Sequence, residues 1–160
     1  MRKVTVAAVQ MRCTENAEEN IARAEALVRK AAAEGAQIIL LPELFERPYF
    51  CQERRYEYYG YAKPVEENDA VRHFSKVAKE LSVVLPISFY ERDKNRLFNT
   101  VAILDADGEN LGIYRKTDVY KRQAMDCTGL IPSLPQSFAE VEHYNDLYQF
   151  LPEHVSDPEE

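Results

Sequence analysis

The sequence predicts an α/β domain over residues 1–117, and three observations support this prediction. Strand-like runs of β-branched residues alternate with segments whose apolar residues recur at helical spacing. Of the two helical segments, 16–36 begins at an asparagine, a residue type that caps helix N-termini, and 68–82 has an apolar inner face. An Asp-Gly pair within residues 96–116 is typical of a β-hairpin turn. Strands that alternate with helices in this way indicate a sheet covered by helices.

The first predicted unit is strand–helix–strand. Residues 3–10 are apolar and rich in Val and Ala, so we expect a strand buried on both faces. In the helix that follows, Asn16 is the predicted N-cap, and Gly35 provides the left-handed residue with which helices often end. Residues 37–44 form a second buried strand that stops at Pro42. The length of this unit fits a right-handed parallel crossover.

The second half of the domain is predicted in the same way. Residues 45–65 are rich in Tyr, Arg and Glu and indicate an irregular loop lined by aromatic side chains. An amphipathic helix over 68–82 and a third strand over 83–91 follow. Residues 96–116 then form two strands joined by the Asp-Gly turn. Every local signal up to this point agrees with one α/β domain.

Residues 118–160 depart from this pattern. The net charge of −7 comes from the end of the chain, because residues 1–117 hold 18 basic and 18 acidic residues, whereas residues 124–160 hold eight acidic residues and no Lys or Arg. The hexapeptide DVYKRQ at 118–123 has a reverse translation that looks like a transposon-end adapter used for sequencing libraries. We see no further strand that would extend the sheet. We therefore expect residues 118–160 to be a non-homologous tail, chimeric or disordered, that packs poorly.

Composition excludes several classes of function. No basic patch argues for nucleic acid, and no apolar run approaches the ~18 residues needed to span a membrane. The three cysteines are odd in number and show no CxxC spacing, so we expect free thiols in a reducing compartment and no structural zinc. A cytoplasmic protein without a cofactor or metal is the expectation.

Two side chains stand at predicted strand ends, where active sites of open α/β sheets gather. Glu43 ends the second strand, and Lys116 ends the hairpin. We expect burial to make Glu43 a usable base near neutral pH. A lysine beside a carboxylate can stay charged and stabilise an oxyanion. Position alone leaves open the alternative that both side chains simply face solvent.

The other reactive side chains are expected to be structural. His73 lies one residue from the inner face of its helix. Neither Cys13 nor Cys51 follows a buried strand into a turn, where a nucleophile would be activated. Cys127 is the only thiol after Lys116, and no predicted strand precedes it.

The order of these elements, together with the motifs LPELF, AKELSVVLPISFYE and NTVAILDADGENLGIYRKT, resembles the nitrilase, or carbon–nitrogen hydrolase, superfamily. The closest resemblance is to its N-carbamoylputrescine amidase branch, and it covers residues 3–117. It implies that residues 1–117 are a partial carbon–nitrogen hydrolase domain, the incomplete N-terminal part of the family's α-β-β-α sandwich. It also implies Glu43 as general base and Lys116 as the oxyanion-stabilising lysine of a Glu-Lys-Cys triad.

The activity that the resemblance implies is hydrolysis of N-carbamoylputrescine to putrescine, carbon dioxide and ammonia in polyamine biosynthesis. The family's thiol lies in a Cys-Trp turn after a later strand, and this sequence contains no Trp. We therefore expect the nucleophilic Cys to be absent and the chain as given to be inactive. Alternatives are a β-ureidopropionase, an ω-amidase, or a non-catalytic binding module of the same fold. The implied partners are a small ureido or amide substrate and, in the intact parent, further copies in a homo-oligomer.

The strand-end positions lead to a geometric prediction. If Glu43 and Lys116 act on one substrate, the carboxylate and the ammonium group should converge at one end of the sheet, within a few ångströms of each other. Side chains at opposite ends of the sheet would contradict this interpretation.

Overall fold

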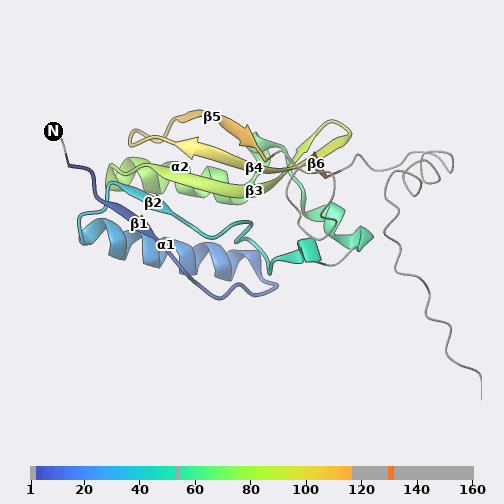
Figure 1. Ribbon diagram of the computed structural model, residues 1–160, viewed down its shortest axis with the longest axis horizontal. Helices are drawn as coiled ribbons and strands as arrows, with labels where there is room; N and C mark the ends of the chain where they lie inside the picture. The colour runs from blue at the N-terminus through green and yellow to red at the C-terminus, as the bar shows by residue number, and fades with distance from the viewer. Residues whose placement is uncertain (1–2, 53–54, 117–129, 132–160) are drawn as a thin grey trace, which may run out of the picture.

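The computed structural model describes residues 3–52, 55–116 and 130–131. In these ranges the strands form a two-stranded sheet and a four-stranded sheet, which an isolated bridge between Ile38 and Val84 joins, and helices α1 and α2 pack together against them (Figure 1). This arrangement confirms the predicted α/β class. Apart from 130–131, the predicted tail of residues 118–160 lies outside the described residues, as does Cys127.

The predicted strand–helix–strand unit is present. Strand β1 (Val6–Ala8) pairs in parallel with β2 (Ile38–Leu40), and helix α1 (Ala17–Ala33) connects them. Both strands are shorter than the sequence predicted. The N–H of Ile39 donates to the carbonyl oxygen of Val84 at 3.0 Å, which joins β2 to the segment that leads into the next strand.

The ends of α1 follow the sequence signals. The side chain of Asn16 accepts hydrogen bonds from the N–H groups of Glu18 and Glu19 at 3.0 and 3.2 Å, so it satisfies two of the donors that a helix start leaves unpaired. At the other end Gly35 has a φ of 91°, and its N–H donates to Ala32. A residue with a β-carbon would be strained there, which is why glycine stops the helix at this point.

The second sheet is an antiparallel meander of β3 (Leu85–Asp93), β4 (Arg96–Leu104) and β5 (Asn110–Arg115). The hairpin predicted for residues 96–116 is therefore confirmed. A two-residue strand, β6 (Leu130–Ile131), also pairs with β4.

The expectation that no strand follows the hairpin is therefore wrong. Strand β6 pairs with Leu97 and Phe98, whereas the pairing of β5 with β4 begins only at Thr100. The backbone of β4 therefore has unpaired hydrogen-bonding groups beyond β5, and a further strand can bind there.

Helix α2 (Asp69–Leu81) packs on β3 and β4 and completes the main core. Asn68 caps it by accepting a hydrogen bond from the N–H of Val71 at 2.9 Å. The largest fully buried apolar side chains of this core come from both helices, the sheet and the loop after β2: Val28, Ile39, Phe45, Phe74, Leu85, Ile87, Phe89 and Leu104. The helices thus cover one face of the sheet.

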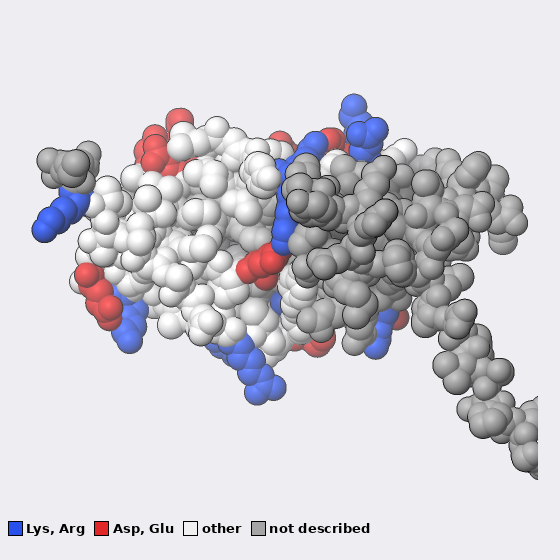
Figure 2. Space-filling view, in the orientation of Figure 1, with Lys and Arg blue, Asp and Glu red and all other residues white. Residues whose placement is uncertain are grey.

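The opposite face of the sheet, the open face, is covered only in part by the described residues: Tyr90 and Leu97 pack there in a second buried cluster with Leu44 and Ala62, whereas β1 and β2 expose side chains. The sequence predicted β1 to be buried on both faces and β2 to be a second buried strand, but Val6 is 70% exposed and Leu40 51% exposed. Figure 2 shows a broad, mostly uncharged surface with charged side chains around its rim. The expectation failed because the apolar pattern of a strand specifies two buried faces only when a second layer covers it, and the described elements supply one layer of helices.

Residues 45–65 form the irregular, aromatic-rich segment that the sequence predicted. Three short 3-10 helices, Phe50–Gln52, Tyr56–Tyr61 and Val65–Glu67, interrupt this part of the chain. Phe50 packs against the rings of Tyr61 and Tyr90, at centroid distances of 5.9 and 5.1 Å. These contacts attach the segment to β3.

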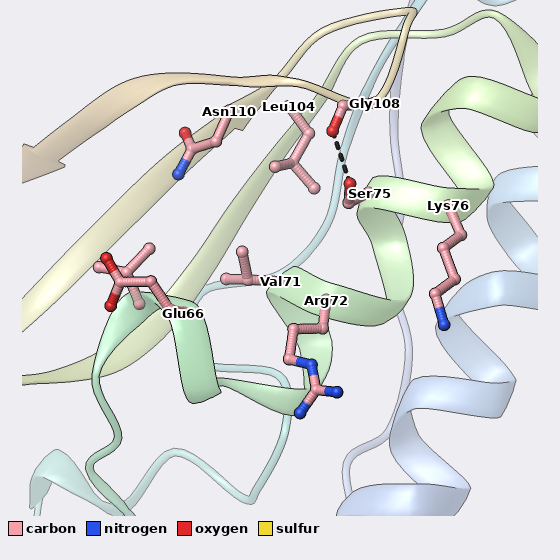
Figure 3. Close-up of a pocket in the computed structure, with 9 residues that line it drawn as sticks. Glu66, Val71, Arg72, Ser75, Lys76, Leu104, Gly108 and Asn110 are labelled. Atoms are coloured by element: carbon pink, nitrogen blue, oxygen red, sulfur yellow. Dashed lines mark hydrogen bonds between the residues drawn. The ribbon is translucent and has the colours of Figure 1, made fainter.

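The turn between β4 and β5 gives a test of the packing. Gly108 has a φ of 85°, and an added Cβ would lie 2.5 Å from the backbone oxygen of Ser75 on α2. The Ser75 hydroxyl also donates to the Gly108 carbonyl at 2.5 Å (Figure 3). We expect Gly108→Ala to lower the free energy of unfolding by about 1–3 kcal/mol in urea denaturation of the full chain.

The matched control is Gly60→Ala, because a Cβ at Gly60 would meet nothing within 4 Å. Its effect should stay within about 0.5 kcal/mol. Equal losses from the two substitutions would show that the turn does not pack on α2 as described.

Candidate active site

Glu43 lies just after β2, where the chain turns sharply. The next residue, Leu44, has a φ of 51°, a conformation that is uncommon for a residue other than glycine. The N–H of Leu44 donates to the hydroxyl of Ser88 on β3 at 3.1 Å, and the Leu44 side chain is buried. These contacts hold the strained turn in place and thereby fix the backbone that carries Glu43.

Lys116 follows β5 directly and reaches the same place. Its Nζ lies 2.8 Å from Oε1 of Glu43, although the two residues are 73 positions apart in the sequence. The predicted convergence of the two side chains is confirmed. Their catalytic roles remain predictions.

A third residue, Asn99 on β4, connects the pair, and sequence reasoning missed it. Its Nδ2 donates to Oε1 of Glu43 at 2.5 Å, and its backbone carbonyl accepts a hydrogen bond from the N–H of Lys116 at 2.8 Å. The side chain is only 2% exposed. The signal that could have identified it is an asparagine in the interior of a largely apolar strand, because a buried amide needs hydrogen-bond partners.

The register of the hairpin places this cluster on the open face of the sheet. Thr100 pairs directly with Arg115, so these two side chains share one face. The neighbouring residues, Asn99 and Lys116, therefore point to the other face. Because the buried side chain of Ala102 shares the face of Thr100 and belongs to the core beneath the helices, the Glu43 cluster lies on the face opposite α1 and α2.

On the helix-covered face, an ion pair holds the end of β5. The guanidinium of Arg115 donates to both oxygens of Glu91, at 2.8 and 2.6 Å, and the hydroxyl of Thr100 donates to Glu91 at 2.6 Å. Arg115 also lies 4.1 Å from the ring centre of Phe98. The hydrogen bonds to Glu91 are the main reason that the pKa of Arg115 is raised. These contacts hold Arg115, and therefore the backbone that leads directly into Lys116, in position.

The loop after Glu43 is tied to the starts of both helices. Asn20 on α1 donates to the backbone oxygen of Glu46 at 3.0 Å, and Asn68 at the start of α2 donates to the Glu46 carboxylate at 2.9 Å. Both asparagines are almost completely buried. Burial raises the pKa of Glu46. Buried polar side chains from the starts of both helices therefore fix the loop at Glu46.

One expectation about the site is wrong. The sequence predicted a buried Glu43, but its side chain is 39% exposed, and that of Lys116 is 35% exposed. Both groups lie on the face of the sheet opposite α1 and α2, which the described residues cover only in part.

The remaining candidates lie apart from this pair. Nε2 of His73 lies 2.7 Å from a carboxylate oxygen of Glu25, in a link between α2 and α1. Cys13 packs against the main core, and burial raises the pKa of its thiol. Cys51 packs against a second apolar cluster that contains Leu44.

Two cavities border the described residues. A small one of about 90 Å³ is lined by Leu44 and Glu46 and by the aromatic rings Phe50, Tyr61 and Tyr90, and neither Glu43 nor Lys116 lines it. A larger one of about 480 Å³ lies at the other end of the hairpin, next to Gly108 and α2. In Figure 3 the basic side chains at this larger cavity project away from Asn110, so they do not converge on a ligand.

Within the ranges that the structure describes, no group of His, Cys, Asp and Glu side chains is arranged to hold a metal ion. No helix in these ranges has the length and apolar character needed to span a membrane.

Comparison with known proteins gives one matching family. A family model described as carbon-nitrogen hydrolase matches residues 5–143. The chain is 50% identical over 117 residues to the N-carbamoylputrescine amidase of Oryza sativa subsp. japonica, a match that covers 73% of this chain and 39% of that protein. It is 40% identical over 119 residues to a citrullinase of Francisella tularensis, covering 74% of this chain and 42% of that protein.

A solved structure shares the fold. The carbon-nitrogen hydrolase of Helicobacter pylori G27 matches with a TM-score of 0.68 at 22% identity, over 84% of this chain and 45% of that one. The chain spans about two fifths of the length of the curated relatives it matches.

Two carboxylates with opposite pKa shifts give a prediction about pH. The pKa of Glu46 is raised from 4.5 by burial, so its carboxylate form lowers stability at neutral pH. We expect Glu46→Gln to raise the free energy of unfolding at pH 7. This gain should decline as the pH falls through the raised pKa and be absent below 4.5, where both the folded and the unfolded state are protonated.

Glu25 on α1 is the matched control with the opposite sign. Hydrogen bonds, first from Arg29 and then from His73, lower its pKa, and burial opposes them. Its contribution to stability is complete above 4.5 and is lost as the pH falls through the lowered pKa. Glu25→Gln should therefore destabilise the chain at neutral pH and have no effect in strong acid. Urea denaturation at several pH values measures both, and effects of the same sign would contradict the assignment.

Proposed function

Since the chain belongs to the carbon–nitrogen hydrolase family, we propose that it is the part of an N-carbamoylputrescine-hydrolysing enzyme that supplies the general base, Glu43, and the oxyanion-stabilising lysine, Lys116. The observation that supports this most is the 2.8 Å contact between Oε1 of Glu43 and Nζ of Lys116. The similarity to the rice enzyme supports the choice of substrate.

The reaction requires a nucleophile, a base and a cation in one place. Glu43 takes the proton from a thiol, and the thiolate attacks the ureido carbonyl carbon. Lys116 then stabilises the negative charge that develops on the carbonyl oxygen. Ammonia leaves, water hydrolyses the carbamoyl-thiol intermediate, and carbon dioxide and the free amine are released.

The open face of the sheet fits this assignment. Catalytic groups that are about one-third exposed gain their full effect only after water is excluded from them. In the proposed enzyme a second layer covers the face that carries Glu43 and Lys116 and brings the thiol with it.

The substrate class has a second candidate. Citrulline, like N-carbamoylputrescine, carries a ureido group, and the chain is 40% identical to the Francisella citrullinase over the aligned region. The two substrates share the bond that is cleaved and differ at the far end of the molecule. Because the higher identity is to the amidase, we favour N-carbamoylputrescine.

A hybrid enzyme tests the roles of the two residues. Residues 1–116 would be joined to the part of the rice amidase that follows its match to this chain. We expect the hybrid to release ammonia from N-carbamoylputrescine faster than from citrulline. Glu43→Gln and Lys116→Met should each lower kcat by about a hundredfold or more.

A matched control is Lys63→Met, which removes a lysine that forms an ion pair with Asp69 and takes no part in the contact between Glu43 and Lys116. Its kcat should equal that of the unchanged hybrid. An active hybrid in which Glu43→Gln keeps full activity would exclude Glu43 as the base.

We further propose that the 160-residue chain by itself has no amidase activity, because its only thiol after Lys116 is Cys127 and the motif of the family's nucleophile is absent. The measurement is ammonia release from N-carbamoylputrescine by the purified chain and by its Cys127→Ser variant. Both should show only background. Release that disappears in the variant would identify Cys127 as the nucleophile and overturn the proposal.

A further inference from the structure

The two oxygens of the Glu43 carboxylate are in different situations. Asn99 Nδ2 donates to Oε1 at 2.5 Å, and Lys116 Nζ lies 2.8 Å from the same oxygen. Among the described residues, neither of these contacts goes to Oε2. One oxygen of the carboxylate is therefore anchored twice, and the other is left to accept a proton.

The anchor is rigid because Asn99 sits in the middle of the sheet. It lies on β4, opposite Tyr90 of β3, and its carbonyl also accepts the hydrogen bond from the backbone of Lys116. At 2% exposure its side chain has little room to move. The same residue therefore sets the direction of the Glu43 side chain and the position of the Lys116 backbone.

From this geometry we propose that Asn99 is a positioning residue that anchors Oε1 of Glu43, so that Oε2 is the atom that takes the proton from the nucleophile. In this step the S–H bond breaks, its proton forms an O–H bond at Oε2, and the electron pair stays on sulfur. The thiolate then attacks the carbonyl carbon. The inference rests on the proposed function, and it adds which carboxylate oxygen reacts and what orients it.

The charges of the cluster support separate roles for Asn99, which anchors Oε1 of Glu43, and Lys116, which stabilises the oxyanion. Lys116 cannot both neutralise Glu43 and stabilise an oxyanion with the same strength, because each contact weakens the other. The neutral amide of Asn99 keeps Oε1 in place without adding charge. When the proton reaches Oε2, Glu43 becomes neutral and Lys116 is released to interact with the oxyanion.

The test uses four versions of the hybrid enzyme: unchanged, Asn99→Ala, Asn99→Asp and Val101→Ala. Val101 is the matched control because it lies two positions along the same strand, on the same face and partly buried. We expect Asn99→Ala to lower kcat by about 10- to 100-fold, the effect of losing one hydrogen bond to a charged group, with KM nearly unchanged. Asn99→Asp keeps the shape and loses the donor, so it should be at least as damaging.

Several outcomes separate the two proposals. If the unchanged hybrid is active, Glu43→Gln is inactive, and both Asn99 variants keep the kcat of Val101→Ala, the proposed function stands and the positioning role is wrong. If Asn99→Asp keeps full activity while Asn99→Ala does not, the residue only fills space. If Glu43→Gln remains active, the proposed function itself fails.

A second measurement covers the case in which the hybrid variants do not fold. In the full 160-residue chain, the rate at which Lys116 reacts with an acylating reagent reports how firmly Glu43 holds it, and peptide mapping by mass spectrometry measures that rate. Asn99→Ala should raise the rate, and Val101→Ala should leave it unchanged. Equal rates in the unchanged chain and Asn99→Ala would overturn the positioning role.

Discussion

The buried carboxylate of Glu91 is the constraint on which the candidate site depends. A carboxylate that is 2% exposed must have a cation and hydrogen-bond donors beside it, because an unpaired buried charge would cost several kcal/mol. Thr100 supplies a donor from the adjacent strand β4, and Arg115 supplies the cation from β5, the strand beyond it. The end of β5 is therefore held against β3 and β4, and Lys116 follows at the next position. The Arg115–Glu91 ion pair on the helix-covered face thus positions Lys116, which pairs with Glu43 on the opposite face.

The second partner, Glu43, is held by different means. The turn after β2 adopts a strained backbone at Leu44, and buried polar side chains fix it from three directions: Ser88 at Leu44, and Asn20 and Asn68 at Glu46. Such strain persists only where the surroundings determine it, which is typical of functional sites. Asn99 then joins both partners within one strand. In the candidate site, buried polar side chains (Ser88, Asn20, Asn68 and Asn99) thus hold the more exposed Glu43 and Lys116 in place.

The sequence predicted what local patterns encode. Apolar periodicity, the capping Asn16 and Gly35 located the helices, the Asp-Gly turn located the hairpin, and strand ends located Glu43 and Lys116. It did not predict the role of Asn99 or the hydrogen bonds from Asn20 and Asn68 to Glu46. The partners of a buried polar residue become apparent only after the strands and helices are packed together. The burial of Val6 and Leu40 was predicted wrongly, since burial depends on a second layer and not on the strand itself. Strand β6 was missed because its pairing depends on the free edge of β4. The boundary at residue 117 and the origin of residues 118–160 remain predictions.

The most direct test of this account is zero-length carbodiimide cross-linking of the full 160-residue chain, followed by peptide mapping. The reagent forms an amide bond only between a carboxylate and an amine in contact, so the structure predicts a cross-link between Glu43 and Lys116, which are 2.8 Å apart. The exposed pair of Lys63 and Asp69, 2.5 Å apart, is the internal positive control. A cross-link in both pairs supports the account. A cross-link at Lys63 and Asp69 with none between Glu43 and Lys116 would show that the two residues do not converge, and it would contradict the central claim.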